Sequence, residues 1–281
     1  MFDVQLRNRY IITGTLTLRT PLHVGSGQGG ELTDAPVVKY LDKRPYVPGS
    51  SFKGVLRSTV ERLAEALDYT SCCLDPDCTF CLSTDKNQGG LQEQYQGLQE
   101  RRVSENKLVR FLTEHLCDTC KTFGSPFAAS KVLIEDLRSA GSNQCPNPLD
   151  IRDGVGIDRD TGTARDKIKF DFETVDIQHR FNLRLTVENA GIVADDRSTV
   201  LALVALGLNE FMKGTRLGGM TSRGLGWCQL ESVQARLLNF QNSTPQQRLD
   251  LLLTRDINQL PFETGEQFIT RWLKCNQCKE G

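Results

Sequence analysis

The sequence predicts an α+β fold with a ferredoxin-like, split βαβ core that carries large insertions. Strand and helix patterns follow one another in the order strand, helix, strands, hairpin, strand, helix, strand. The 281 residues are enough for a sizeable core, and 38% hydrophobic with 25% charged residues is typical of a folded globular protein. Lys and Arg number 34 against 35 for Asp and Glu, so affinity for a polyanion requires a local basic patch.

The first predicted elements are a strand, a loop and a second strand. Residues 10–18, YIITGTLTL, are rich in β-branched side chains with partial alternation, which predicts a strand that ends before Pro21. A glycine-rich loop, HVGSGQGG, follows at 23–30, and a short apolar strand is expected at 35–40. This loop either approaches a ligand closely or is mobile.

Residues 50–67 form the most regular predicted helix, with apolar side chains at helical spacing and Ser50 as its N-cap. Lys53 and Arg57 are four residues apart, so they share one face near the helix start, where free backbone N–H groups also favour phosphate. Residues 1–60 hold eight basic and four acidic side chains. This part of the chain is therefore the better anion-binding candidate, although an ordinary solvated helix face is the alternative.

A polar hairpin is expected at 151–169, around the turn at 160–163. This hairpin has few apolar side chains to bury, so it is either an arm that binds a partner or a surface loop. A second glycine-rich loop, LGGMTSRGL, lies at 217–225. The other predicted elements are a helical segment at 103–115, strands at 128–136, 181–188 and 226–230, a helix at 198–212, and tail helices at 246–253 and 265–273.

Compartment and cysteine chemistry are linked. No apolar run approaches the ~20 residues that cross a bilayer, and the first ten residues are too polar for a signal peptide, so we expect a cytoplasmic protein. In that reducing compartment the ten cysteines are expected to be thiols or metal ligands. The three histidines, His23, His115 and His179, give weaker evidence for a catalytic site, since they form no recognisable triad. The sequence also contains no H-E-x-x-H, Walker A or G-x-S-x-G motif.

Two C-x-x-C pairs predict a closed tetrahedral site for structural Zn²⁺, formed by Cys78, Cys81, Cys117 and Cys120. Such a site has no open position for catalysis, and it explains how a polar insertion with little core keeps its shape. Unrelated buried thiols or a redox C-x-x-C are the alternatives. Four further cysteines bear on the site. Either of Cys72 and Cys73 can replace Cys78, and Cys275 and Cys278 form one more pair at the terminus.

Six ordered segments carry a resemblance to a known family. They are TPLHVGSG at 20–27, TDAPV at 33–37, YVPGSSFKGVLR at 46–57, the element at 117–124, RDGVGIDR at 152–159 with TGTA at 161–164, and LGGMTSRGLG at 217–226. Together they resemble the RAMP superfamily of CRISPR proteins, most closely the backbone subunit of type III effector complexes. The elaborate cysteine insertion and the long tail depart from the simplest members and suggest a divergent subtype.

The resemblance implies an RRM-like palm over residues 1–235 and a C-terminal extension at 236–281. Within the palm it implies a zinc-bearing insertion at about 70–122 and a thumb hairpin at about 150–170. The implied partners are a guide RNA, a complementary target RNA and other type III effector subunits, with no membrane. Sequence recognition then falls to base pairing between the two RNAs.

The resemblance also implies roles for single residues. Asp34 matches the aspartate with which such subunits cut target RNA, assisted by Mg²⁺ or Mn²⁺; a turn-forming Asp is the alternative, and Glu31 is a weaker substitute. The positions implied to contact guide RNA are His23, Gly25, Ser50, Lys53, Arg57, Arg152, Gly218, Gly219 and Arg223. Two other functions remain open: processing of precursor guide RNA by a histidine, and a zinc-stabilised scaffold without activity.

Overall fold

The computed structural model has the mixed helix and sheet content that the sequence predicts. None of its described helices is long and apolar enough to cross a membrane. The described residues are 5–27, 29–30, 33–73, 81–84, 87–141, 148–190, 198–241, 243–254 and 256–274, with the side chains of 164–168 excepted.

The main sheet is built around β1 (Asn8–Leu18), which pairs antiparallel with β7 (Arg180–Glu188) on one side and β9 (Trp227–Asn239) on the other. The sheet order is β10-β9-β1-β7-β4-β2, with β3 beside β7 and β8 beside β9. The short strands are β2 (Tyr46–Val47), β3 (Val132–Ile134), β4 (Leu137–Ser139), β8 (Thr215–Arg216) and β10 (Glu263–Thr264).

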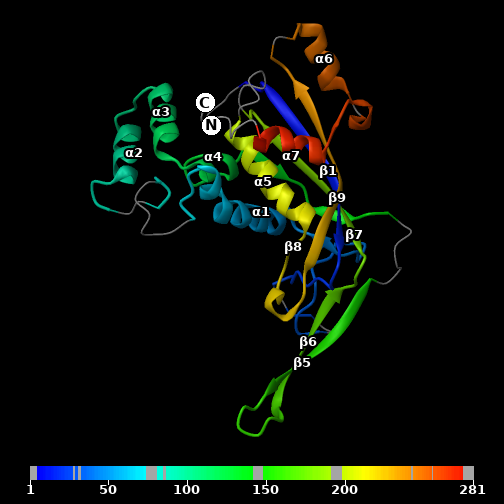
Figure 1. Cartoon of the computed structure of the whole chain (residues 1–281). Coiled ribbons are helices and arrows are strands. Elements are labelled where there is room, and N and C mark those ends of the chain that lie inside the picture. The colour runs from blue at the N-terminus through cyan, green and yellow to red at the C-terminus, as the bar shows by residue number, and fades with distance from the viewer. Residues whose placement is uncertain are drawn as a thin grey trace.

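Three helices supply the apolar side chains that cover one face of this sheet: α1 (Gly49–Leu63), α5 (Thr199–Lys213) and α7 (Gly265–Lys274) (Figure 1). β7 alternates between buried and more exposed residues, because successive side chains of a strand point to opposite faces. At the contact between α1 and α5, a Cβ on Gly207 would lie 2.5 Å from Leu56 Cδ1. A larger residue at this position would therefore force the buried Leu56 side chain to move.

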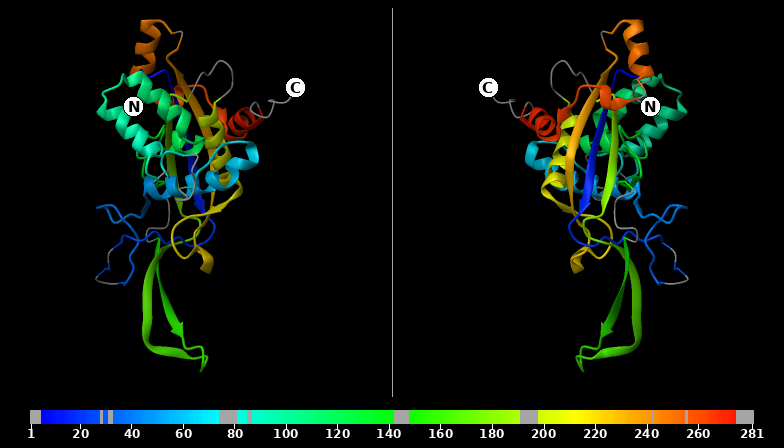
Figure 2. Two further views of the ribbon diagram at one scale, coloured as in Figure 1. Left: turned by 90° about the vertical axis from the view of Figure 1, so that its left-hand side faces the viewer. Right: turned by 90° about the vertical axis from the view of Figure 1, so that its right-hand side faces the viewer.

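Other elements project from this body (Figures 1 and 2). β5 (Leu149–Ile157) and β6 (Ala164–Val175) pair as a long hairpin that extends beyond one end of the main sheet. The cysteine-rich insertion contains α2 (Leu91–Glu100), α3 (Glu105–His115) and α4 (Asp118–Phe123). The remaining elements are α6 (Pro245–Leu253) and the short helices η1 (Ala64–Leu67), η3 (Thr221–Arg223) and η4 (Ile257–Gln259).

Several predicted elements differ in detail. The segment expected as a strand at 35–40 forms only isolated bridges, and the strand expected at 128–136 is limited to β3. Helix α1 begins at Gly49 after Pro48, so the prediction of Ser50 as N-cap is wrong. Helix α2 was not predicted. At the expected boundary between the palm and the C-terminal extension, residue 235 lies inside β9, which continues to Asn239. Phe268 and Trp272 of α7, in the expected extension, belong to the main core.

Candidate functional site

Asp34 lies at the root of the β5–β6 hairpin, opposite Asp171 of β6. The Asp34 backbone N–H donates to Asp171 Oδ1 at 2.7 Å, and the Asp171 backbone N–H donates to Asp34 Oδ2 at 3.1 Å. The second oxygen of each carboxylate has no hydrogen-bond partner in the described part of the chain. Asp34 is exposed and Asp171 is half-buried, so this pair of neighbouring carboxylates meets solvent with unused oxygen atoms.

Glu173 ties the segment after Asp34 to the hairpin. Its backbone N–H donates to the Ala35 carbonyl at 3.0 Å, and its carboxylate accepts from the Val37 N–H at 3.0 Å. The same carboxylate pairs with Lys39 Nζ at 2.7 Å. Because Glu173 is only 8% exposed, these contacts are shielded from water and hold Asp34 against β6.

His23 connects the two glycine-rich loops with the hairpin root. Its ring is buried, its Nδ1 lies 2.7 Å from the Glu173 carbonyl oxygen, and its carbonyl accepts from the Gly219 N–H at 2.8 Å. Gly218 has φ of 83°, and a Cβ there would clash with the His23 carbonyl. His23 therefore positions both loops, and its burial does not favour the RNA contact or the general-base role considered for it.

The N-terminus of α1 already has a carboxylate partner. Asp136 Oδ1 accepts from the Gly49 N–H at 2.9 Å, and Asp136 Oδ2 accepts from the Tyr40 hydroxyl at 3.0 Å. This acid partly satisfies the helix N-terminus that was expected to attract phosphate. Farther along, Lys53 Nζ donates to Ser130 Oγ at 2.8 Å, and burial, followed by the nearby charge of Arg57, lowers the pKa of Lys53.

Arg57 is directed toward the cysteine-rich insertion. Its guanidinium donates to Glu61 Oε1 at 2.7 Å, to the Gly124 carbonyl at 3.0 Å and to Cys120 Sγ at 3.6 Å. Burial disfavours its charge, but the hydrogen bond and charge of Glu61 outweigh burial, so the pKa of Arg57 is raised. With its side chain 18% exposed, Arg57 joins α1 to α4, and this arrangement does not favour the predicted contact with RNA.

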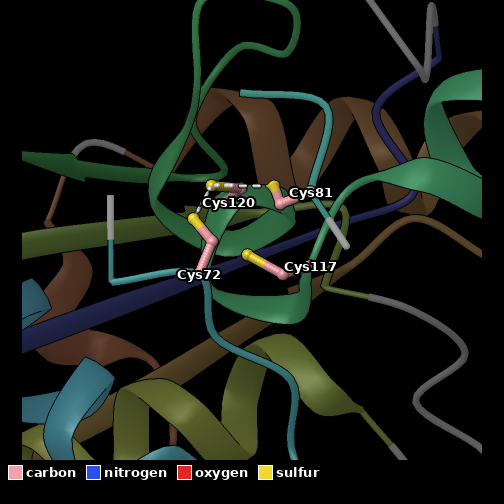
Figure 3. Close-up of side chains that lie close together, drawn as sticks. All are labelled: Cys72, Cys81, Cys117 and Cys120. Atoms are coloured by element: carbon pink, nitrogen blue, oxygen red, sulfur yellow. Dashed lines mark hydrogen bonds between the residues drawn. The ribbon is translucent and has the colours of Figure 1, made fainter. Parts of the chain in front are cut away.

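Four buried cysteines converge beside Arg57 (Figure 3). Cys117 and Cys120 come from the start of α4, and Cys72 and Cys81 come from the segments that flank the insertion. All four sulfur atoms lie within 4.8 Å of one another, with Cys120 Sγ 3.6 Å from Cys72 Sγ and 3.9 Å from Cys81 Sγ. A tetrahedral ion with ~2.3 Å bonds to sulfur requires sulfur–sulfur separations of about 3.8 Å. The cluster therefore has the spacing and the donor atoms to hold a metal.

The structure decides between the cysteines left open by the sequence. Cys72 belongs to the cluster, whereas the exposed Cys73 has its Sγ 3.8 Å from the Glu61 carbonyl. The predicted ligand Cys78 lies outside the described residues, as does the Cys275/Cys278 pair. Hydrogen bonds from Cys117, Cys120 and Cys72 lower the pKa of Cys81, whereas the hydrogen bond with Cys117 raises the pKa of Cys120, so the four thiols share their protons and Cys81 is the one that favours thiolate.

The remaining predicted contacts are on the surface. Ser50, Gly25, Gly219 and Arg223 are exposed, and Arg152 on the hairpin is loosely paired with Asp150 at 3.7 Å. The weaker candidate Glu31 lies outside the described residues. Among the other histidines, His115 Nδ1 lies 2.8 Å from the Phe111 carbonyl and His179 Nε2 lies 2.9 Å from Ser139 Oγ.

The sequence did not identify Asp171, Glu173 or Asp136. Asp171 and Glu173 occur in FDFET at 170–174, where acidic side chains alternate with apolar ones in the ordinary pattern of a strand. Asp136 follows β3 in a short connection. These three residues could be recognised only from the fold, which brings Asp171 and Glu173 close to the segment after Asp34 and brings Asp136 to Gly49.

Comparison with known proteins gives two findings. A model of the RAMP superfamily matches residues 15–229. A curated relative from Methanothermobacter thermautotrophicus, named CRISPR system Cms endoribonuclease Csm3, is 33% identical over 84 residues. That alignment covers 28% of this chain and 34% of the relative, so the chain matches about a third of the relative's length.

Proposed function

Because the chain belongs to the RAMP superfamily, we propose that it is a backbone subunit of a type III CRISPR effector complex. In this role it binds guide RNA and cleaves complementary target RNA at Asp34. The main supporting observation is the Asp34–Asp171 pair at the hairpin root. The similarity to a relative named as an endoribonuclease is consistent with this activity. The sheet order β9-β1-β7-β4, with α1 after β1 and α5 after β7, supports a ferredoxin-like palm.

The proposed chemistry uses the unengaged oxygen atoms of the carboxylate pair. Oxygen donors suit a hard divalent cation such as Mg²⁺ or Mn²⁺, which would stabilise negative charge on the reacting phosphate. Asp34 accepts the proton of a ribose 2′-hydroxyl, whose oxygen forms a bond to the adjacent phosphorus. The bond from phosphorus to the 5′-oxygen breaks, and that oxygen takes a proton from solvent. The products are a 2′,3′-cyclic phosphate and a 5′-hydroxyl end.

The hairpin supports a positioning role in this reaction. It extends from the end of the sheet at which Asp34 is held, so a duplex of guide and target lying along that end meets the hairpin beside the carboxylates (Figure 2). Lys53, Ser50 and the loop around Gly218 and Arg223 offer charge and backbone contacts to the guide. Such contacts read no bases, which leaves sequence recognition to base pairing.

The cleavage proposal is tested with Asp34→Ala in the full chain assembled with its guide RNA and partner subunits. We expect the rate of target cleavage to fall about 100-fold or more, because a positioned proton acceptor contributes at least that factor. Target binding stays unchanged. The matched control is Asp42→Ala, which removes an exposed aspartate loosely paired with Arg44 at 3.8 Å. Cleavage by the Asp34 variant at the wild-type rate would remove Asp34 from the mechanism.

For the cysteine cluster we propose structural Zn²⁺. Four sulfur donors at tetrahedral spacing fit this ion and leave no position for a substrate. Adjacent residues provide a matched test, since Cys72 is in the cluster and Cys73 is not. We expect Cys72→Ser to lose most of the bound zinc and to unfold at lower temperature, whereas Cys73→Ser keeps both properties. Elemental analysis and thermal unfolding measure these effects, and equal zinc content in the two variants would contradict the assignment.

A further inference from the structure

A groove of about 700 Å³ lies between helices α1 and α5 and strands β8 and β9. Its walls come from the second half of α1, the end of α5, strand β8 and the start of β9. Small-molecule sites usually measure ~300–1,000 Å³, so the groove is large enough for one nucleotide. The lining side chains that bear on its chemistry are Thr59, Arg62, Glu210, Arg216 and Trp227.

Trp227 gives the groove a fixed aromatic surface. It is 39% exposed, although β9 anchors it through a backbone N–H that donates to Thr20 Oγ1 at 2.8 Å. The ring lies over Gly214, where a Cβ would be 2.6 Å from Trp227 Cζ2. Arg216 is the direct antiparallel partner of Trp227, so both side chains lie on the same face of this strand pair. The ring is therefore held on rigid structure while part of it faces solvent.

The charges around this ring favour an anion. Arg62 and Arg216 are exposed, and their hydrogen bonds in the described structure go to backbone carbonyls, of Ser58 and Thr221 respectively. The one lining acid, Glu210, is paired with Lys213 at 2.9 Å. Two guanidinium groups thus remain without a carboxylate partner among the described residues, beside an aromatic face.

The chemistry of the lining fits a nucleotide. The two arginines can pair with an anionic phosphate, and the tryptophan offers a flat face to an aromatic base. Thr59 also lines the groove, but its Oγ1 is buried beneath the surface.

We propose that this groove binds one nucleotide of single-stranded RNA, with its base stacked on Trp227 and its phosphate at Arg62 and Arg216. The inference rests on the proposed function and deepens it. The glycine-rich loop with η3 connects β8 to β9, so the predicted guide contact Arg223 lies only a few residues along the chain from Arg216 and Trp227. Base stacking on an aromatic side chain is tolerant of sequence, as a subunit that carries changing guides requires.

The two tryptophans make the proposal testable by fluorescence. Trp272 is fully buried in the core, so only the emission of Trp227 is accessible to a stacking base. The full-length protein is titrated with a short single-stranded RNA, and separately with an abasic sugar-phosphate strand of equal length. We expect RNA to quench the fluorescence and the abasic strand to bind without quenching. Trp227→Ala is expected to weaken RNA binding about tenfold, as measured by anisotropy, and to leave abasic-strand binding unchanged.

The outcomes separate this inference from the proposed function. RNA that binds the wild-type protein without quenching Trp227 would overturn the groove assignment and leave guide binding intact. No RNA binding at all would overturn both. Quenching by an acidic peptide with the same affinity as RNA would indicate a protein ligand and would also overturn the assignment. The wild-type quenching measurement remains decisive if Trp227→Ala fails to fold.

Discussion

Replacing Arg57 with methionine separates a structural role for this residue from the RNA contact predicted from sequence. The substitution keeps a long apolar stem and removes the guanidinium that links α1 to α4. Three interactions are lost, to Glu61, to the Gly124 carbonyl and to Cys120 Sγ. Glu61 then remains in the same place without its partner.

The size of the effect follows from burial. The side chains of Arg57 and Glu61 are 18% and 11% exposed, so water screens their interaction only slightly. Removing one partner of a buried pair costs about 3–5 kcal/mol, and we expect about 3 kcal/mol because both side chains keep some solvent contact. With an unfolding entropy of ~2.1 cal/mol/K per residue, a chain of 281 residues loses about 5 °C in Tm.

The assay combines thermal unfolding, zinc release to a chelator and RNA binding. Arg110→Met is the control, since it removes an exposed arginine of α3 that pairs with Glu114, four residues farther along, at 2.8 Å. Its stability should change by about 0.5 kcal/mol or less. Arg57→Met should also release zinc faster, because loss of a partner to a metal ligand weakens metal affinity ~10–100-fold. Arg57→Lys retains the charge but not the planar fork, so we expect an intermediate stability.

One pattern of results would refute this reasoning. If Arg57→Met binds RNA more weakly than wild type but unfolds at the same temperature and releases zinc at the same rate, Arg57 acts on RNA directly. Its contacts to Glu61 and Cys120 would then have no part in holding α1 against the insertion.

Two further predictions concern stability. Burial lowers the pKa of His179 to about 4, below its ordinary value of 6.5. As pH falls, the His179 ring therefore becomes protonated in the unfolded chain before it does so in the folded protein. Stability due to His179 is present above pH 6.5 and lost toward pH 4; at pH 5 the loss is about 2 kcal/mol. Urea unfolding at pH 7 and pH 5 should show a smaller pH effect for His179→Gln, and an equal effect would exclude His179 as the cause. Gly207→Val places a side chain against Leu56, and we expect a loss of about 1–3 kcal/mol from overpacking. The control Gly97→Ala, in α2 with open space around it, should gain up to ~1 kcal/mol, and equal stability of the two variants would contradict this packing.

Elements with a strong local pattern were predictable. β7 alternates every two residues and α5 is an apolar run with Ser198 at its start, where the Ser198 hydroxyl accepts from the Leu201 N–H. Helix α2 lacked such a signal, because LQEQYQGLQE contains glycine and few apolar residues and buries none of them. The segment 35–40 has strand-like composition, yet its partners on β6 are more than 130 residues away.

The sequence predicted only part of the membership of these clusters. Cys81, Cys117 and Cys120 lie together as their motifs indicate, but the fold supplies Cys72 to the cysteine cluster and places Asp171 beside Asp34. Spacing within a C-x-x-C pair shows that two thiols can share an ion. It does not show which further sulfur reaches the same point.

The sequence by itself determined the α+β class, the main helices and strands, the polar hairpin and a cysteine motif with the spacing of metal ligands, because each depends on residues a few positions apart. The tertiary structure decided that Arg57 contacts Cys120 rather than solvent, that Asp136 lies at the start of α1, and that Asp34 lies against Asp171. These contacts join residues 63 to 137 positions apart. The pairing of β1 with β7 and β9 brings such segments together, and no local propensity encodes that pairing.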